Sequence, residues 1–176
     1  MVSDAAADVF LASPLLHELD SASRQALLNT LVEVRVESGT MLLEQGQPYD
    51  HIAFMIDGRA TVVRERKGRT EKLATFTAPA VFGLTTFFRT TPPDFSVRAD
   101  TPVWLLTFDH HAHALLRRVD LNAAEQLALA ALRHLAGRFD MLLDKISSEM
   151  DTQPPSSRKT NEWASFRARL FEEANP

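Results

Sequence analysis

The sequence predicts a mainly β domain with flanking helices, an α+β class in which an antiparallel sandwich or roll lies between two helical segments. In the middle of the chain, residues 31–108 form short apolar or alternating runs separated by turn residues, a pattern typical of antiparallel strands. On both sides of this segment, apolar residues recur at helical intervals. The 176 residues, 45% of them hydrophobic, suffice for one buried core but not for two ordinary domains.

Residues 1–30 are predicted to form two short N-terminal helices of this domain. Their apolar side chains recur at three- and four-residue intervals; they are Phe10, Leu11, Leu15, Leu16, Leu19, Leu27, Leu28 and Leu31. Ser13 followed by Pro14 suits a helix cap with proline at the first helical position. Ser21 is expected to start the second helix in the same way.

Residues 31–108 are predicted to form seven or eight strands. The predicted strands cover residues 32–36, 41–43, 52–56, 60–66, 73–76, 96–99 and 103–108. Glycines at positions 39, 46, 58 and 68 interrupt the earlier runs. The strand count and spacing suit a sandwich or roll better than a parallel sheet.

Residues 109–151 are predicted to be helical and to serve dimerisation. Asp109 suits the helix cap, and the helix is expected to continue to about Met150. Apolar residues then recur with a seven-residue repeat, with Glu125 at the one irregular position; they are Leu121, Ala128, Leu132, Leu135, Phe139, Leu142 and Ile146. We call this set the seam. We expect it to pair two copies of the chain, and the alternative, packing onto the chain's own roll, stays open.

Residues 152–176 are predicted to be a linker and an amphipathic tail. The run Pro154-Pro155-Ser156-Ser157 ends the long helix. Beyond it, apolar residues fall on one face of a helical segment; they are Trp163, Phe166, Leu170 and Phe171. Such a tail either docks on its own body or binds something else.

The stretch from Gly39 to Val62 carries a family resemblance. Gly39 to Gly46 is followed by Ile52 to Val62 with its central Gly58, and glycines at such turns accept positive φ angles that other residues resist. This framework resembles the cyclic nucleotide-binding domain family, including the sensor half of bacterial catabolite-activator-type regulators. The resemblance covers roughly residues 10–145 and implies an antiparallel double-stranded β-helix, or jelly roll.

The resemblance also implies a ligand site, the phosphate-binding cassette, which here covers residues 79–96. In the family, a Glu after Phe-Gly grips the ribose hydroxyl and an Arg at the start of the following strand grips the cyclic phosphate. In this chain Leu84 stands at the Glu position and Pro93 at the Arg position, followed by Asp94. The candidate site residues are Phe82, Gly83, Leu84, Thr85, Thr86, Pro93, Asp94, Phe95 and Ser96.

We therefore expect binding of cyclic AMP or cyclic GMP in the family's manner to be lost. The former cavity is expected to be filled by apolar side chains, namely Leu84, Phe87, Phe88 and Phe95. Two basic residues remain as substitutes for the missing arginine. Arg89 lies in the loop, whereas Arg98 alternates with Val97 and Ala99 and is expected to face away from the pocket.

The predicted function is a non-catalytic regulatory module that acts through contacts with an unidentified protein partner. The alternative is a sensor of a cyclic nucleotide, cyclic dinucleotide or other small molecule through unusual pocket residues, and a transcription regulator is a third hypothesis. No catalytic nucleophile and base, and no phosphate loop, is found in the sequence. We expect no enzyme activity and no cofactor.

Further expectations concern metals, DNA and membranes. On a helix, His110 and His113 share a face that His111 cannot join, so no metal site is expected and the imidazoles are expected to face solvent. A net charge of −4 and a pI near 5.8 oppose DNA binding, and the residues after Met150 are too few for a helix-turn-helix. Without a signal peptide or a long apolar run, the expectation is a cytoplasmic protein without membrane contact.

Overall fold

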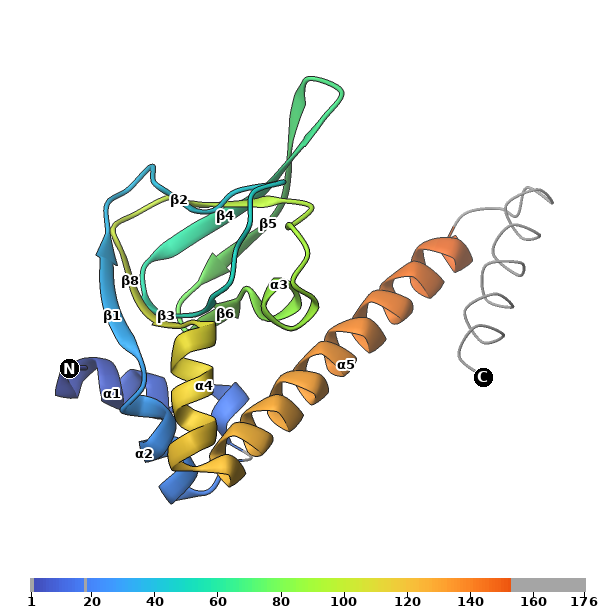
Figure 1. Cartoon of the computed structure of the whole chain (residues 1–176). Coiled ribbons are helices and arrows are strands. Elements are labelled where there is room, and N and C mark those ends of the chain that lie inside the picture. The colour runs from blue at the N-terminus through green and yellow to red at the C-terminus, as the bar shows by residue number, and fades with distance from the viewer. Residues whose placement is uncertain (1, 18, 153–176) are drawn as a thin grey trace. The chain divides into compact units, whose positions relative to one another are not determined.

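A computed structural model describes residues 2–17 and 19–152 of the chain (Figure 1). The chain divides into two compact units, residues 1–132 and residues 133–176. The first unit holds the strands and the N-terminal helices, and the described part of the second unit is helical. The predicted linker and amphipathic tail, including Trp163, Phe166, Leu170 and Phe171, lie outside the described residues.

Three short helical segments precede the strands: α1 (Asp4–Leu11), the 3-10 helix η1 (Pro14–Leu16) and α2 (Ser21–Leu28). Phe10 and Leu27 are fully buried. The cap of α2 is Asp20, whose carboxylate accepts a hydrogen bond from the Ser23 amide at 2.7 Å. The expectation that Ser21 is the cap was wrong by one residue, because a carboxylate satisfies the free amide in the same way as a hydroxyl.

Eight strands form two four-stranded antiparallel sheets, as the fold class predicted. The strands are β1 (Val32–Val36), β2 (Met41–Leu43), β3 (Ile52–Asp57), β4 (Arg59–Arg66), β5 (Arg69–Thr77), β6 (Ala80–Phe82), β7 (Ser96–Ala99) and β8 (Val103–Phe108). One sheet has the order β1-β8-β3-β6 and the other β2-β7-β4-β5. The predicted strand at 73–76 is longer than expected, and β6 was missing from the prediction.

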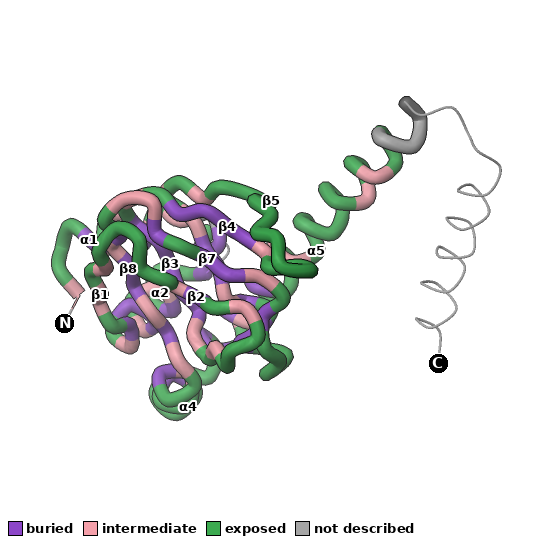
Figure 2. Tube along the Cα trace, turned by 90° about the horizontal axis from the view of Figure 1, so that it is seen from above, coloured by how far each residue is buried: buried purple, intermediate pink, exposed green. Residues whose placement is uncertain are grey.

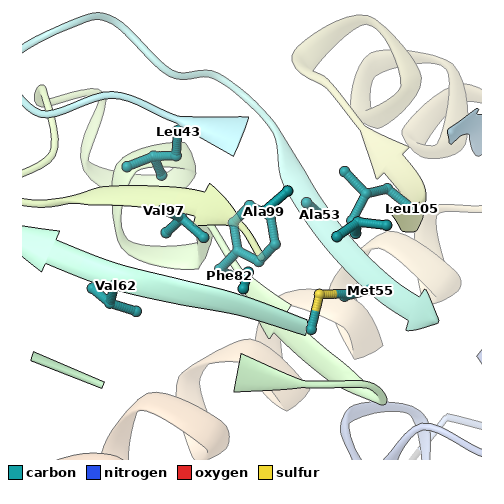
Figure 3. Packing of buried hydrophobic residues seen from close by; sticks show 10 residues of the cluster. Leu43, Ala53, Met55, Val62, Phe82, Val97, Ala99 and Leu105 are labelled. Carbon is teal, nitrogen blue, oxygen red and sulfur yellow. The ribbon is translucent and has the colours of Figure 1, made fainter. Parts of the chain in front are cut away.

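The core of the roll lies between the two sheets. Val62 of β4 and Val97 of β7 point into it from one sheet, and Met55 and Leu105 point into it from the other (Figure 3). Ala60 of β4 belongs to the same buried cluster. Inward and outward residues alternate along β4 and β7, as the pleat requires. In Figure 2, the middle of β4 is buried, whereas β5 is exposed along most of its length.

The C-terminal region contains two helices, α4 (His110–Val119) and α5 (Leu121–Thr152). Asp109 caps α4, as predicted, by accepting a hydrogen bond from the Ala112 amide at 2.7 Å. The expectation of one uninterrupted helix from residue 109 was wrong at Asp120, which has extended backbone angles and caps α5 through the Ala123 amide at 2.9 Å. Within residues 2–17 and 19–152, no helix combines the length and apolarity needed to cross a bilayer.

Candidate ligand site at the cassette helix

The cassette is built around a sharp turn from β6 into the short helix α3 (Leu84–Arg89). Gly83 makes this turn with a φ of +84°, and a Cβ atom there would lie 2.2 Å from the His51 carbonyl oxygen. Only glycine fits this close backbone approach. The Gly83 carbonyl then accepts hydrogen bonds from the Phe87 amide and the Thr86 hydroxyl, both at 2.9 Å, which fixes the first turn of α3.

The two predicted grip positions carry buried apolar side chains. Leu84 is 3% exposed. Pro93 is also buried, and its carbonyl accepts a hydrogen bond from the Gly46 amide at 2.9 Å. Thr85, between the two predicted site residues Leu84 and Thr86, is exposed. At positions 84 and 93, the leucine and proline side chains offer no charge and no hydrogen-bonding group to a ligand.

The loop that follows α3 is tied to the roll by three polar contacts. Besides the Pro93 carbonyl, the Asp94 carbonyl accepts a hydrogen bond from Arg64 Nε at 3.2 Å. Ser96 is buried, and its hydroxyl accepts a hydrogen bond from the Gln45 amide at 2.9 Å. These contacts join the cassette to the β2–β3 connection and to β4, so the loop has a defined position.

Arg64 is a site residue that the sequence analysis missed. It lies four residues after Ala60 and two residues after Val62 on β4, and both of those residues face the core of the roll. Since alternate residues of a strand share a face, the same pattern could have placed Arg64 on the inner side of the sheet, at its cassette end. Arg64 thus brings a guanidinium group to the loop that contains Pro93 and Asp94.

The inside of the roll near the cassette is aromatic. The Phe76 and Phe82 rings are nearly parallel with centroids 6.2 Å apart, and the Tyr49 ring lies 6.4 Å from Phe82. Burial of the Tyr49 hydroxyl, together with the Asp50 carboxylate, raises the pKa of Tyr49 well above its usual value. Phe95 also packs against this interior cluster. These side chains make the interior beside the cassette apolar.

The expected filling of the cavity by α3 was partly wrong. Leu84 and Phe87 are buried, but Phe88 is 42% exposed. Phe87 packs toward α4, with its ring centroid 4.3 Å from His110 and 5.8 Å from Phe108. The reason is geometrical: adjacent residues of a helix point in different directions, so Phe87 and Phe88 cannot both enter the same space.

The expectation of solvent-facing imidazoles on α4 holds for His110 and His111, which are exposed, but not for His113, which is partly buried. His110 stacks on Phe87 with an interplanar angle of 18°, and the partly buried His113 contacts Phe87 and Phe108. Burial lowers the pKa of His113, and the nearby Arg117 and His110 lower it further. Among residues 2–17 and 19–152, no cluster of three or more His, Asp or Glu side chains is arranged to hold a metal ion.

The remaining basic candidates lie outside the cassette interior. Arg98 is exposed while its neighbours Val97 and Ala99 are buried in the core, so the expectation that it faces away from the pocket is confirmed. Arg89 is exposed at the end of α3. Arg89 and Arg98 are thus both solvent-exposed in this structure.

The seam residues of α5 are largely solvent-accessible. The large exposed members are Leu121 (62%), Leu132 (64%), Phe139 (45%) and Leu142 (53%), and Ala128, Leu135 and Ile146 are half-buried. A different set of residues on this helix is buried: Ala123, Ala124, Leu127, Ala130 and Ala131. At 100° per residue, the two sets are centred about 100° apart around the helix axis. The start of α5 thus has a buried apolar face and a separate exposed one.

Part of the chain is similar in sequence to known proteins. Residues 33–118 match the family model described as "Cyclic nucleotide-binding domain". The chain is similar to a cAMP-dependent protein kinase regulatory subunit of Schizosaccharomyces pombe, with 31% identity over 96 residues, 54% of this chain and 23% of the relative. The chain therefore spans about a quarter of that relative's length.

Solved structures of similar fold include a cyclic nucleotide-binding domain from Methylobacillus flagellatus, with a TM-score of 0.71, 17% identity, and coverage of 87% of this chain and 85% of that one. The N-terminal domain of a transcriptional regulator from Streptomyces coelicolor has a TM-score of 0.64 and 26% identity, covering 76% of this chain and 96% of that one. The Thermus thermophilus catabolite activator protein has a TM-score of 0.63 and 21% identity, with 77% and 63% coverage.

Proposed function

Because residues 33–118 belong to the cyclic nucleotide-binding domain family, we propose that this chain is a non-catalytic regulatory module that has lost the family's side-chain grips for cyclic AMP and cyclic GMP. It acts through contacts with another protein. The relatives named above include a kinase regulatory subunit and the N-terminal domain of a transcriptional regulator, which supports a regulatory role.

The observation that carries the proposal is the pair of buried apolar residues at the grip positions. Leu84 and Pro93 are both buried, and the Pro93 carbonyl is bonded to the Gly46 amide. A hydrogen bond to a charged group contributes about 1.5–3 kcal/mol, so losing two of them costs about 3–6 kcal/mol. That loss corresponds to about two to four orders of magnitude in affinity. The carboxylate of Asp94, exposed on the same loop, adds repulsion toward an anionic phosphate.

Thermal unfolding with cyclic AMP, cyclic GMP and cyclic di-GMP tests the proposal. A ligand at 100 times its dissociation constant stabilises a protein by about 2.7 kcal/mol, so even weak binding is visible at millimolar concentration. We expect no change in Tm with any of the three. A stabilisation by cyclic AMP at micromolar concentration would contradict the proposal.

One observation favours a second candidate function, a small-molecule sensor with an unusual grip. Arg64 donates to the Asp94 carbonyl through Nε, and its terminal nitrogens are further donors toward an anion. If a nucleotide stabilises the protein and Arg64→Ala removes the effect, this candidate replaces the first. Arg66→Ala is the matched control, since Arg66 is exposed at the end of the same strand.

The surface proposed for protein contact is the cassette, residues 79–96. Phe88 is 42% exposed there, beside the exposed Thr85 and Arg89. Aromatic side chains with accessible surface are enriched in protein interfaces. A photocrosslinking residue at position 88 is expected to trap a discrete partner in cells. The same residue at Val32, which is 60% exposed on β1, serves as the control and is expected to trap none.

We also propose that two copies of the chain pair through the seam of α5. Leu132 and Phe139 are 64% and 45% exposed, and a seven-residue repeat of such residues is the pattern that pairs helices. Light scattering after size exclusion is expected to give a dimer for the wild type and a monomer for Leu132→Glu/Phe139→Glu. Met141→Glu, at a residue 73% exposed outside the seam, is expected to remain dimeric. A monomeric wild type at high concentration would refute the pairing.

A further inference from the structure

The outer face of the sheet β2-β7-β4-β5 carries a polar surface that the cassette does not use. Ala60 and Val62 of β4 face the core, so Thr61 and Val63 face outward. Arg98 of β7 lies opposite Thr61, and Lys72 of β5 lies opposite Val63. Strands 4.7–4.9 Å apart thus place Arg98 and Lys72 on either side of β4, with Cα atoms about 12 Å apart.

This face is hollowed into an open groove of about 650 Å³. Its lining is polar and comes from three neighbouring strands and the turn after β7: Arg59, Thr61, Val63, Thr70, Lys72, Thr75, Arg98 and Asp100. None of these residues belongs to the cassette. A volume in this range suits a small organic molecule rather than a protein domain.

The groove is positively charged. Of its three cations, Arg59 lies 3.9 Å from an Asp100 oxygen, and that carboxylate also accepts a hydrogen bond from the Thr61 hydroxyl at 2.7 Å. Among the residues that the structure describes, no carboxylate lies within 4 Å of the charged groups of Lys72 or Arg98. Lys72 and Arg98 therefore form no ion pair with any residue that the structure describes.

The residues around the groove add to its positive charge. Residues 59–77 contain six Lys and Arg residues and two Glu residues, a net charge of +4, whereas the whole chain has a net charge of −4. The rest of the chain is therefore strongly acidic, and the β4–β5 hairpin concentrates positive charge on one surface. Such a surface raises the local concentration of small anions.

We propose that this groove binds an organic diphosphate, with Arg98 and Lys72 as the residues that hold its two anionic groups. A guanidinium pairs with a phosphate through two parallel hydrogen bonds, and an ammonium acts as a compact point charge. The hydroxyl of Thr75 is an additional donor, whereas the Thr70 hydroxyl already donates to the Glu65 carboxylate; the Asp100 carboxylate is an acceptor for a ligand hydroxyl. This site is independent of the cassette and of the function proposed for it.

Calorimetric titration with inorganic pyrophosphate, ADP and adenosine tests the proposal. Pyrophosphate and ADP are expected to bind, more weakly at high salt, and adenosine is expected not to bind. Lys72→Ala/Arg98→Ala is expected to weaken pyrophosphate binding by about tenfold or more. Both residues are exposed, so the variant is expected to keep the wild-type Tm.

Arg66→Ala/Arg69→Ala is the matched control, because it removes the same charge from the tip of the same hairpin. It is expected to keep the affinity for pyrophosphate within about twofold. An equal loss in both double variants would overturn the proposal in favour of unspecific attraction of anions to the hairpin. Absence of pyrophosphate binding at low salt would overturn it too, as would amide shifts in NMR spectra confined to the cassette, residues 79–96.

Discussion

Replacement of Phe87 by alanine tests how much the packing of α3 against α4 contributes to the free energy of unfolding. Phe87 is 2% exposed and packs against Phe108 and the two histidines His110 and His113. Truncation of a buried Phe costs about 3–5 kcal/mol of unfolding free energy. Since 1 kcal/mol shifts the Tm of a chain of this size by about 2–4 °C, Phe87→Ala is expected to lower the Tm by roughly 6–20 °C.

Phe88→Ala is the matched control, at the next position of the same helix. Because Phe88 is 42% exposed, its truncation removes less buried surface and is expected to cost under about 1.5 kcal/mol. Urea unfolding of the two variants and the wild type, followed by circular dichroism, gives the free energies directly. Equal losses for the two variants, or a larger loss for Phe88→Ala, would refute the placement of Phe87 against α4.

Three further predictions concern backbone and titration. Gly83→Ala is expected to lose about 2–4 kcal/mol in urea unfolding, because its Cβ atom would overlap a backbone oxygen at positive φ, whereas Gly39→Ala, with φ +87° and open space around it, is expected to lose about 1 kcal/mol. Hydrogen bonds from the Ser23 amide and the Gln126 side chain lower the pKa of Asp20 from 3.8 to about 2. The unfolded chain then takes up the proton first, so stability is expected to fall as the pH drops from about 4 toward 2, less steeply in Asp20→Asn. Burial lowers the pKa of His113, so stability present above pH 6.5 is expected to be lost as the pH falls below it, and thermal unfolding of His113→Gln should reveal a weaker dependence.

The sequence predicted the strands that carry an alternating or continuous apolar run, and it missed the segments that carry neither. β1 and β7 alternate clearly and were predicted to the residue. The first half of β5, from Arg69, is polar on both faces because the strand is exposed at the edge of its sheet, so no apolar pattern marks it. The three residues Ala80–Phe82 are too few to show any period.

The break between α4 and α5 was missed for a similar reason. Asp120 was given no role of its own within the predicted helix, although an aspartate three residues before a free amide is the residue type that caps a new helix. The seam itself was predicted from spacing alone. Which apolar residues of α5 are buried, such as Leu127, depends on the neighbouring helices and could not be derived from spacing alone.

At the cassette, the family resemblance located Leu84 and Pro93, and the structure adds that both are buried. The approach of Arg64 to the Asp94 carbonyl joins residues 30 positions apart, and such pairs follow from sheet register rather than from local sequence. The contact of Phe87 with His113 likewise depends on how two helices separated by β7 and β8 pack together.

The edge position of β5 has a consequence for the behaviour of the protein in solution. In the part of the chain that the structure describes, this strand of nine residues pairs only with β4, which leaves a row of its amide and carbonyl groups open for another chain. Exposed edges of this length template aggregation unless charged side chains interrupt them. Arg69, Glu71 and Lys72 supply that interruption, and valines in their place would turn the hairpin into a nucleus for stacked β-aggregates.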